Sequence, residues 1–282
     1  MPLSIITENI CFSGRQIRCQ HTAASLHCDM NFSIFLPPQA EQQKVPVLFW
    51  LSGLTCTDEN FVQKAGAQRA AAKYGVAIVA LDTSPRGISV PDDNEAAYDF
   101  GLGAGFYVNA TQMPFAKNYH MYDYVAEELP DLVFSEFSLD ASRQGIFGHS
   151  MGGHGALIIA LKNPQRFKSV SAFAPICAPT QCAWGQKALS GYLGEDQSTW
   201  RAYDACALIE DGAACPPLLV DQGEADNFLS EQLKPALLQE ACAQADLALS
   251  LNLHPGYDHS YFFIASFIDS HVAFHAQHLI NP

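Results

Sequence analysis

The sequence predicts an α/β fold built on a doubly wound, mostly parallel sheet with helices on both faces. Apolar runs recur along the chain, and several are nearly continuous, which is typical of parallel strands buried on both faces. Stretches of helical character lie between these runs, and alternation of strand and helix implies right-handed crossovers. With 282 residues and no Gly/Ser-rich or Pro-rich linker, the chain is expected to form a single domain over residues 1–282.

Each expected element rests on its local pattern. Two weaker β-like segments, at residues 5–19 and 28–36, are expected to begin the same sheet in antiparallel fashion. The buried strands are expected at residues 45–51, 76–81, 143–147, 170–174, 217–220 and 248–253. The helices are expected at residues 61–74, 119–136, 151–162, 229–244 and about 261–278.

Two segments, at about residues 83–118 and 175–204, exceed ordinary loop length. The first is rich in Gly, Pro and aromatic residues, and the second contains Trp184, Tyr192 and Trp200. Long ordered loops at the carboxyl ends of strands are where open α/β sheets build their sites. We therefore expect both insertions to be loops that frame a pocket.

Composition excludes several classes of function. Apolar residues make up 49% of the chain, yet no apolar stretch is long enough to span a membrane, and no basic segment followed by an apolar one begins the chain. A cytoplasmic protein without a membrane partner is expected. The net charge of −14, with 15 scattered basic residues, argues against a nucleic-acid partner. The nine cysteines are odd in number and form no Cys-x-x-Cys pair, which favours reduced thiols.

Ser150 lies at the centre of a Gly-x-Ser-x-Gly element, between an apolar run and a small-residue helix. This is the signature of a nucleophile elbow. The serine must occupy a strained turn, so the residues two before and two after it need to be small. Gly148 and Gly152 meet that need.

A serine nucleophile needs a histidine base, and in this arrangement the order along the chain is Ser, acid, His. Five histidines follow His154. His254 lies inside the last predicted strand, while His271, His275 and His278 lie on the last predicted helix. The remaining one, His259, follows a strand in a Pro-Gly-Tyr-Asp-His-Ser turn, and is therefore the expected base.

The candidates for the acid are Asp221, Glu224, Asp226 and Asp258. Asp221 continues a predicted strand, and Asp258 adjoins the histidine, where it would orient the turn. Asp226 falls in a loop after a strand, which matches the role of the acid. A helix N-cap is the alternative role for this residue.

Acyl transfer also needs backbone donors directed at the developing oxyanion. The first is expected from the amide of Met151, the residue after the nucleophile. The second is expected from the turn Ser-Gly-Leu-Thr after the strand at residues 45–51, where a glycine lets the amide of Leu54 turn inward. The alternative is a plain strand-ending turn.

Metal binding is not expected, and neither is a cofactor. His149 and His154 flank the serine, but no third ligand is evident, so packing or hydrogen bonding is the expected role. His271 and His275 share a helix face without the intervening Glu of a zinc-protease motif, which favours a solvated face.

Five blocks together resemble the S-formylglutathione hydrolase, or esterase D, family, along nearly the whole chain. They read SGLTCTDENF at residues 52–61, DFGLGAGFYVNA at 99–110, GHSMGGHGA at 148–156, DQGEADNFL at 221–229 and PGYDHSYFF at 255–263. The resemblance implies an α/β-hydrolase fold, a cytosolic location, a homodimer, and hydrolysis of S-formylglutathione to glutathione and formate. By position it places the family's triad on Ser150, Asp226 and His259, and its oxyanion donors on Leu54 and Met151.

The same resemblance places a cysteine near the active site, here Cys56, whose modification would obstruct the substrate. The alternative for Cys56 is a buried, inert thiol. The glutathione arm carries two carboxylates and one ammonium group, and its contacts are not assigned. Arg86 and Lys117 are basic residues in a suitable segment; a solvated charge is the expected role for each, and a contact with the arm is the alternative. Two other functions stay open: a broad carboxylesterase for small acyl esters, and a scaffold of the same fold without catalysis.

Overall fold

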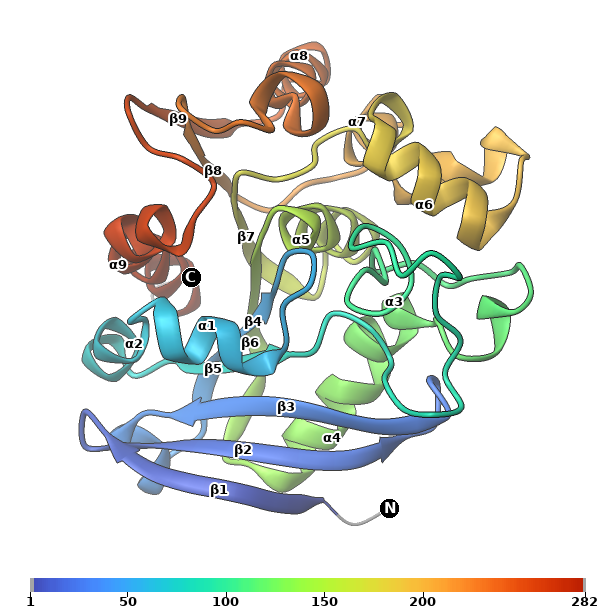
Figure 1. The fold of residues 1–282 in the computed structure, drawn as a ribbon. Coiled ribbons are helices and arrows are strands. Elements are labelled where there is room, and N and C mark those ends of the chain that lie inside the picture. The colour runs from blue at the N-terminus through green and yellow to red at the C-terminus, as the bar shows by residue number, and fades with distance from the viewer. Residues whose placement is uncertain (1–2, 281–282) are drawn as a thin grey trace.

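A single nine-stranded sheet forms the centre of the protein in the computed structural model, which describes residues 3–280 (Figure 1). The four terminal residues of the expected domain lie outside this range. The strands are β1 (Ser4–Cys11), β2 (Gly14–Ala23), β3 (Cys28–Leu36), β4 (Val45–Leu51), β5 (Ala77–Leu81), β6 (Leu139–His149), β7 (Phe167–Phe173), β8 (Leu218–Gly223) and β9 (Leu249–His254). Their order across the sheet is β1-β2-β3-β5-β4-β6-β7-β8-β9.

The antiparallel part of the sheet comes from the first 36 residues, as expected. The segment predicted at 5–19 is a hairpin rather than one strand, because the chain reverses at Phe12 and Ser13, where φ is 48° and 59°. β2 pairs with β3 from Arg15 to Ala23, and β3 also pairs antiparallel with β5.

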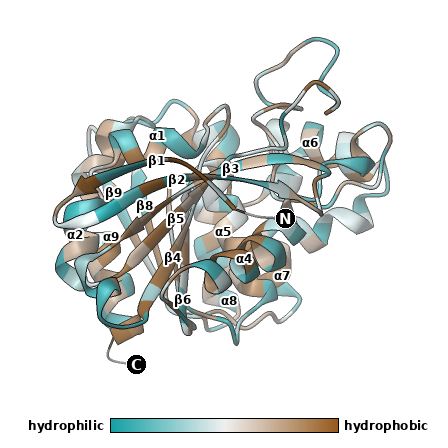
Figure 2. Cartoon of the chain, turned by 90° about the horizontal axis from the view of Figure 1, so that it is seen from below, coloured by the Kyte–Doolittle hydropathy of each residue, from teal (hydrophilic) through white to brown (hydrophobic). Residues whose placement is uncertain are grey.

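The remaining strands run parallel to one another, from β5 through β4, β6, β7 and β8 to β9. The central strands carry the hydrophobic residues that Figure 2 shows along them, and every residue of β4 and β5 is buried. The doubly wound α/β fold predicted from these apolar runs is therefore confirmed.

Helices cover both faces of the sheet (Figure 1). α1, α2 and α9 lie on one face, and α4 and α5 lie on the other. The α-helices are α1 (Asp58–Lys64), α2 (Gln68–Tyr74), α3 (Met121–Asp123), α4 (Leu129–Glu136), α5 (Met151–Lys162), α6 (Ala183–Leu193), α7 (Ala205–Glu210), α8 (Pro235–Gln244) and α9 (Tyr261–Ile280). No helix within residues 3–280 is long and apolar enough to cross a membrane.

Three predicted helices are interrupted. The helix expected at 61–74 is divided into α1 and α2 near Gly66, which has a φ of 72°. The helix expected at 229–244 is divided at Lys234, whose left-handed conformation precedes Pro235. The helix expected at 119–136 contains a π-helical turn at Tyr124–Glu128 between α3 and α4.

The two insertions differ from each other. Residues 83–118 form irregular backbone with isolated bridges, as expected of a long loop. Residues 175–204 are instead largely helical, because α6 and a 3₁₀ segment at Gln197–Tyr203 occupy most of them. Trp184 and Tyr192 are buried on α6, so the aromatic residues that suggested a pocket loop also pack a helix.

Candidate active site

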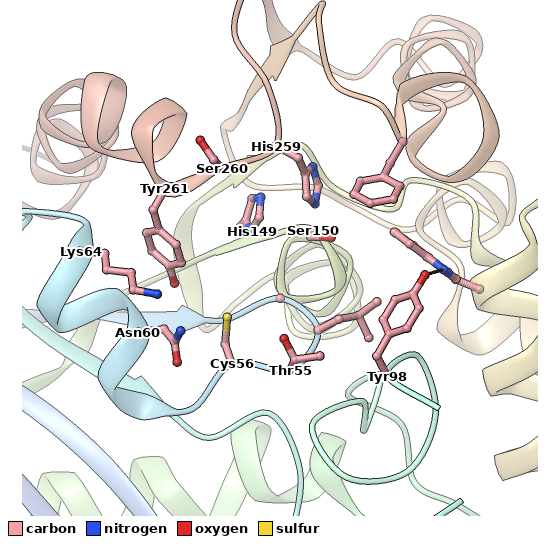
Figure 3. Close-up of a pocket in the computed structure, with 14 residues that line it drawn as sticks. Thr55, Cys56, Asn60, Lys64, Tyr98, His149, Ser150, His259, Ser260 and Tyr261 are labelled. Carbon is pink, nitrogen blue, oxygen red and sulfur yellow. Dashed lines mark hydrogen bonds between the residues drawn. The ribbon is translucent and has the colours of Figure 1, made fainter. Parts of the chain in front are cut away.

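A cavity of about 360 Å³ opens beside the carboxyl ends of β4, β6, β8 and β9. Its lining comes from segments far apart in the sequence, and includes Ser150 and His259 (Figure 3). The lining residues are Gly53, Leu54, Thr55, Cys56, Asn60, Lys64, Tyr98, His149, Ser150, Trp184, Phe228, His259, Ser260 and Tyr261.

Ser150 occupies the strained turn that the sequence predicts. It directly follows β6 and precedes α5, with φ 58° and ψ −119°. A Cβ atom on Gly148 would lie 2.2 Å from the carbonyl oxygen of Gly152. A Cβ on Gly152 would lie 2.0 Å from the carbonyl oxygen of Leu51. Both positions therefore require glycine, and the turn presents the Ser150 side chain to the cavity.

His259 and Asp226 are joined by a short hydrogen bond. The Nδ1 atom of His259 lies 2.6 Å from Oδ2 of Asp226, and the carboxylate is fully buried. The other carboxylate oxygen accepts from the backbone amide of Phe228 at 2.8 Å, so Asp226 also stabilises its own loop. Gln222 donates to Oδ2 at 3.3 Å. Figure 3 shows the free edge of the His259 ring facing Ser150.

The other acidic candidates lie elsewhere. Asp221, within β8, accepts a hydrogen bond from Asn252 at 2.8 Å. Glu224 is exposed. Asp258 accepts from the amide and hydroxyl of Ser260, at 3.0 and 2.6 Å. Among residues 3–280, Asp226 is the carboxylate in contact with His259.

The two histidines beside Ser150 have different surroundings. The centroid of the His149 ring lies 4.4 Å from that of the His259 ring. Burial is the main cause that lowers the pKa of His149, and the charge of His259 lowers it further. The Nε2 atom of His154 donates to the carbonyl of Phe106 at 3.0 Å, and burial lowers its pKa to about 4. Both are packed as neutral rings.

The prediction that His271 and His275 lie on a solvated face is wrong, because both are fully buried against β7 and β8. Nδ1 of His271 and Nε2 of His275 both contact the hydroxyl of Ser171, at 2.8 Å each. Nδ1 of His275 lies 2.7 Å from Ser169, and Nε2 of His271 lies 3.5 Å from Asp221. This polar network fills the space between α9 and the sheet.

The amides of Leu54 and Met151 are both placed beside Ser150. Met151 is the first residue of α5, where backbone N–H groups have no intrahelical partner. The turn that carries Leu54 packs against the elbow so closely that a Cβ on Gly53 would lie 3.1 Å from Cβ of Ser150. Within the described chain, neither amide donates to a protein acceptor.

Several lining residues were not predicted. These include Lys64, Asn60 and Tyr261, which lie at one end of the cavity (Figure 3). Cys56, which was expected near the active site, lies near them. Burial raises the pKa of the Cys56 thiol. Asn60 and Cys56 fall in the SGLTCTDENF block, whereas nothing in the sequence alone shows that the start of α9 meets the end of α1.

Aromatic residues form the opposite end of the cavity. The indole N–H of Trp184 donates to the hydroxyl of Tyr98 at 3.1 Å, and the Trp184 ring lies 4.6 Å from that of Phe228. Tyr98 and Trp184 come from the two insertions, so each insertion contributes to the lining.

Neither basic residue suggested for the glutathione arm lines this cavity. The guanidinium of Arg86 is bound by the carboxylate of Asp82 at 2.9 and 3.0 Å, and by the carbonyl of Cys56 at 3.3 Å. Lys117 is exposed away from the lining residues. Neither residue is therefore assigned to the cavity: Lys117 is a solvated charge, as expected, whereas the charge of Arg86 is paired with Asp82.

Comparisons with known proteins show which family the chain resembles. The esterase family model, described as "Putative esterase", matches residues 23–274. S-formylglutathione hydrolase of Mus musculus is 52% identical over 281 residues and 99% of both chains. The solved structure of an S-formylglutathione hydrolase from Agrobacterium tumefaciens is 50% identical and superposes with a TM-score of 0.96, covering 98% of this chain and 99% of that one.

A fluorophosphonate-binding serine hydrolase of Staphylococcus aureus shares the fold alone, at 18% identity and a TM-score of 0.75 over 93% of this chain and 98% of that one. The two close relatives carry the stronger argument, because each is at least 50% identical and is matched over nearly the whole length of both chains. The chain therefore belongs to the S-formylglutathione hydrolase family of esterases.

Proposed function

We propose that this chain hydrolyses S-formylglutathione to glutathione and formate through a covalent formyl-serine at Ser150. The observation that carries the proposal is the His259–Asp226 pair beside Ser150, in a chain that is 52% identical to an S-formylglutathione hydrolase along its whole length. This reaction removes formaldehyde that has been captured by glutathione.

The proposed roles follow from position. Ser150 Oγ attacks the formyl carbon while Nε2 of His259 accepts its proton. Asp226 holds the proton on Nδ1 and stabilises the imidazolium that forms. The amides of Leu54 and Met151 donate to the oxyanion, each contributing about 3 kcal/mol to the barrier reduction. The glutathione thiolate leaves and is protonated, and water, activated by His259, then releases formate and regenerates Ser150.

A thioester suits this site. A thiol of pKa about 8.5 leaves much more easily as its anion than an alcohol does, so the enzyme needs little general-acid help. Positioning and the two oxyanion donors therefore carry most of the barrier reduction.

A broad carboxylesterase for small acyl esters is the second candidate, because the same groups would cleave them and the matching family model is an esterase. The experiment compares kcat/KM for S-formylglutathione with that for an aryl acetate. The proposal expects a large preference for the thioester; equal or inverted values favour the carboxylesterase. A catalytically inactive scaffold is excluded by turnover of either substrate.

We also propose that residues 1–282 form one domain, that the protein acts as a cytoplasmic homodimer, and that modification of Cys56 obstructs the substrate. The single continuous sheet supports one domain. The resemblance of the quoted sequence blocks to the family supports both the single domain and the cytoplasmic homodimer. The position of Cys56 in the cavity lining supports the third. Sedimentation equilibrium measures the oligomeric state directly.

A further inference from the structure

We infer that Lys64 at the end of α1 recognises the glycyl carboxylate of the glutathione arm, an inference that rests on the proposed function. Among the described residues that line the cavity, Lys64 is the only lysine, arginine, aspartate or glutamate. The chain as a whole has a formal charge of −14, with 29 acidic residues against 15 basic ones. The cavity lining, with one ammonium group and no carboxylate, therefore differs in charge from this acidic chain as a whole. Such a lining suits an anionic ligand.

The charge of Lys64 is available to a ligand. Within residues 3–280, no carboxylate lies within 4.0 Å of its ammonium group. The nearest acids along α1 point elsewhere, since Arg18 binds Asp58 at 2.9 Å and Glu59 at 3.0 Å. Lys64 Nζ instead lies 5.5 Å from the ring centroid of Tyr261, which holds it at the cavity.

Two further polar groups lie beside Lys64. The carbonyl oxygen of the Asn60 side chain accepts from the amide of Thr57 at 2.9 Å in a capping box, which turns its NH₂ group to the cavity (Figure 3). The hydroxyl of Tyr261 is buried against the side chains of Cys56 and Ser52 at the same end of the cavity. The ammonium group of Lys64 and the amide of Asn60 therefore converge at one end of the cavity, as donors suited to a carboxylate.

Glutathione carries two carboxylates, and they differ in their surroundings. The γ-glutamyl α-carboxylate has an ammonium group on the same carbon, which Lys64 would repel. The glycyl carboxylate stands alone at the other end of the arm. Because nothing acidic lines the cavity to receive an ammonium group, the geometry favours the glycyl carboxylate at Lys64.

The test combines a variant with a changed substrate. Lys64→Gln removes the charge, and S-formylglutathione with its glycyl carboxylate converted to an amide removes the partner. Lys73→Gln is the matched control, because Lys73 is also exposed and lies over a tyrosine ring, 4.9 Å from the centroid of Tyr74, but outside the cavity. Lys64→Arg keeps the charge and should retain part of the parent's activity on S-formylglutathione.

We expect Lys64→Gln to lower kcat/KM for S-formylglutathione about fivefold, through KM, and to leave the glycyl-amide substrate and an aryl acetate unchanged. Equal losses on the acid and the amide, or an equal loss in Lys73→Gln, would overturn the assignment. Parent enzyme that cleaves aryl acetate but not S-formylglutathione would instead overturn the proposed function itself, so the two failures are distinguishable.

Discussion

Oδ2 of Asp226 lies 2.6 Å from Nδ1 of His259, although the two residues are 33 positions apart in the chain. The loops after β8 and β9 bring them together, and the carboxylate is completely shielded from water while 18% of the histidine side chain is exposed. A buried carboxylate on one side of an accessible ring fixes both the orientation and the tautomer of that ring. The proposed catalytic role of Asp226 depends on this bond.

Asp226→Asn should lower kcat by about 10⁴-fold, because an amide that donates to Nδ1 favours the wrong tautomer of His259. The amide oxygen can still accept from the backbone of Phe228, so the loop should persist. Steady-state kinetics and thermal unfolding measure the two effects. A variant with near-parent kcat would show that Asp226 serves only as a cap.

Ser150→Ala should lower kcat by about 10⁴-fold or more, because it removes the nucleophile. The variant should keep its fold and lose stoichiometric labelling by a fluorophosphonate. Ser260 provides the matched control, since it lines the same cavity but binds Asp258. Ser260→Ala should keep the label. If Ser150→Ala is labelled as fully as the parent, the nucleophile lies elsewhere.

Modification of Cys56 should inhibit the enzyme slowly at neutral pH. Burial raises the pKa of this thiol, so the reactive thiolate is scarce there and becomes more abundant as pH rises. We expect a bulky maleimide to inactivate the parent, faster at pH 9 than at pH 7, and to spare Cys56→Ser. The variant retains the eight other cysteines, so its response also shows whether their modification inhibits the enzyme. Equal sensitivity of both proteins would refute the proposal.

Sequence patterns predicted the strands of the sheet and the proposed triad residues, because both leave a pattern in neighbouring residues of the chain. Continuous apolar runs identify buried parallel strands, and the positions of Ser150, Asp226 and His259 follow from turns at strand ends. The histidines of α9 could not be placed in this way. Their helix spacing is the same whether the face meets water or β7, and the buried partners Ser169 and Ser171 lie about a hundred residues away.

The cavity end at Lys64 was missed for a similar reason. Lys64 occupies the last position of α1, and its relation to Tyr261 depends on how α1 and α9 pack on one face of the sheet. The break at Gly66 that ends this helical segment was missed because one glycine in a helical pattern is tolerated by propensity alone. Tertiary packing decides the position of Lys64, whereas the left-handed conformation of Gly66 marks the break.

Stability should fall as the pH is lowered below about 6.5, because the buried histidines stay neutral in the folded chain at pH values where they are protonated in the unfolded chain. Burial lowers the pKa of His154 to about 4, whereas an unfolded histidine titrates near 6.5. Between these values the unfolded state binds a proton that the folded state does not, so the free energy of unfolding decreases by about 3 kcal/mol for this residue. Burial lowers the pKa of His149, His271 and His275 in the same direction.

His154→Gln isolates one of these contributions. A glutamine can still donate to the carbonyl of Phe106, which His154 contacts at 3.0 Å, but it carries no titratable group. Urea unfolding of parent and variant at pH 8, 6.5 and 5 measures the difference. The variant should lose less stability than the parent on acidification, whatever its stability at pH 8. Parallel curves for the two proteins would mean that His154 is protonated equally in the folded and unfolded chains, and that its burial has no part in the acid sensitivity.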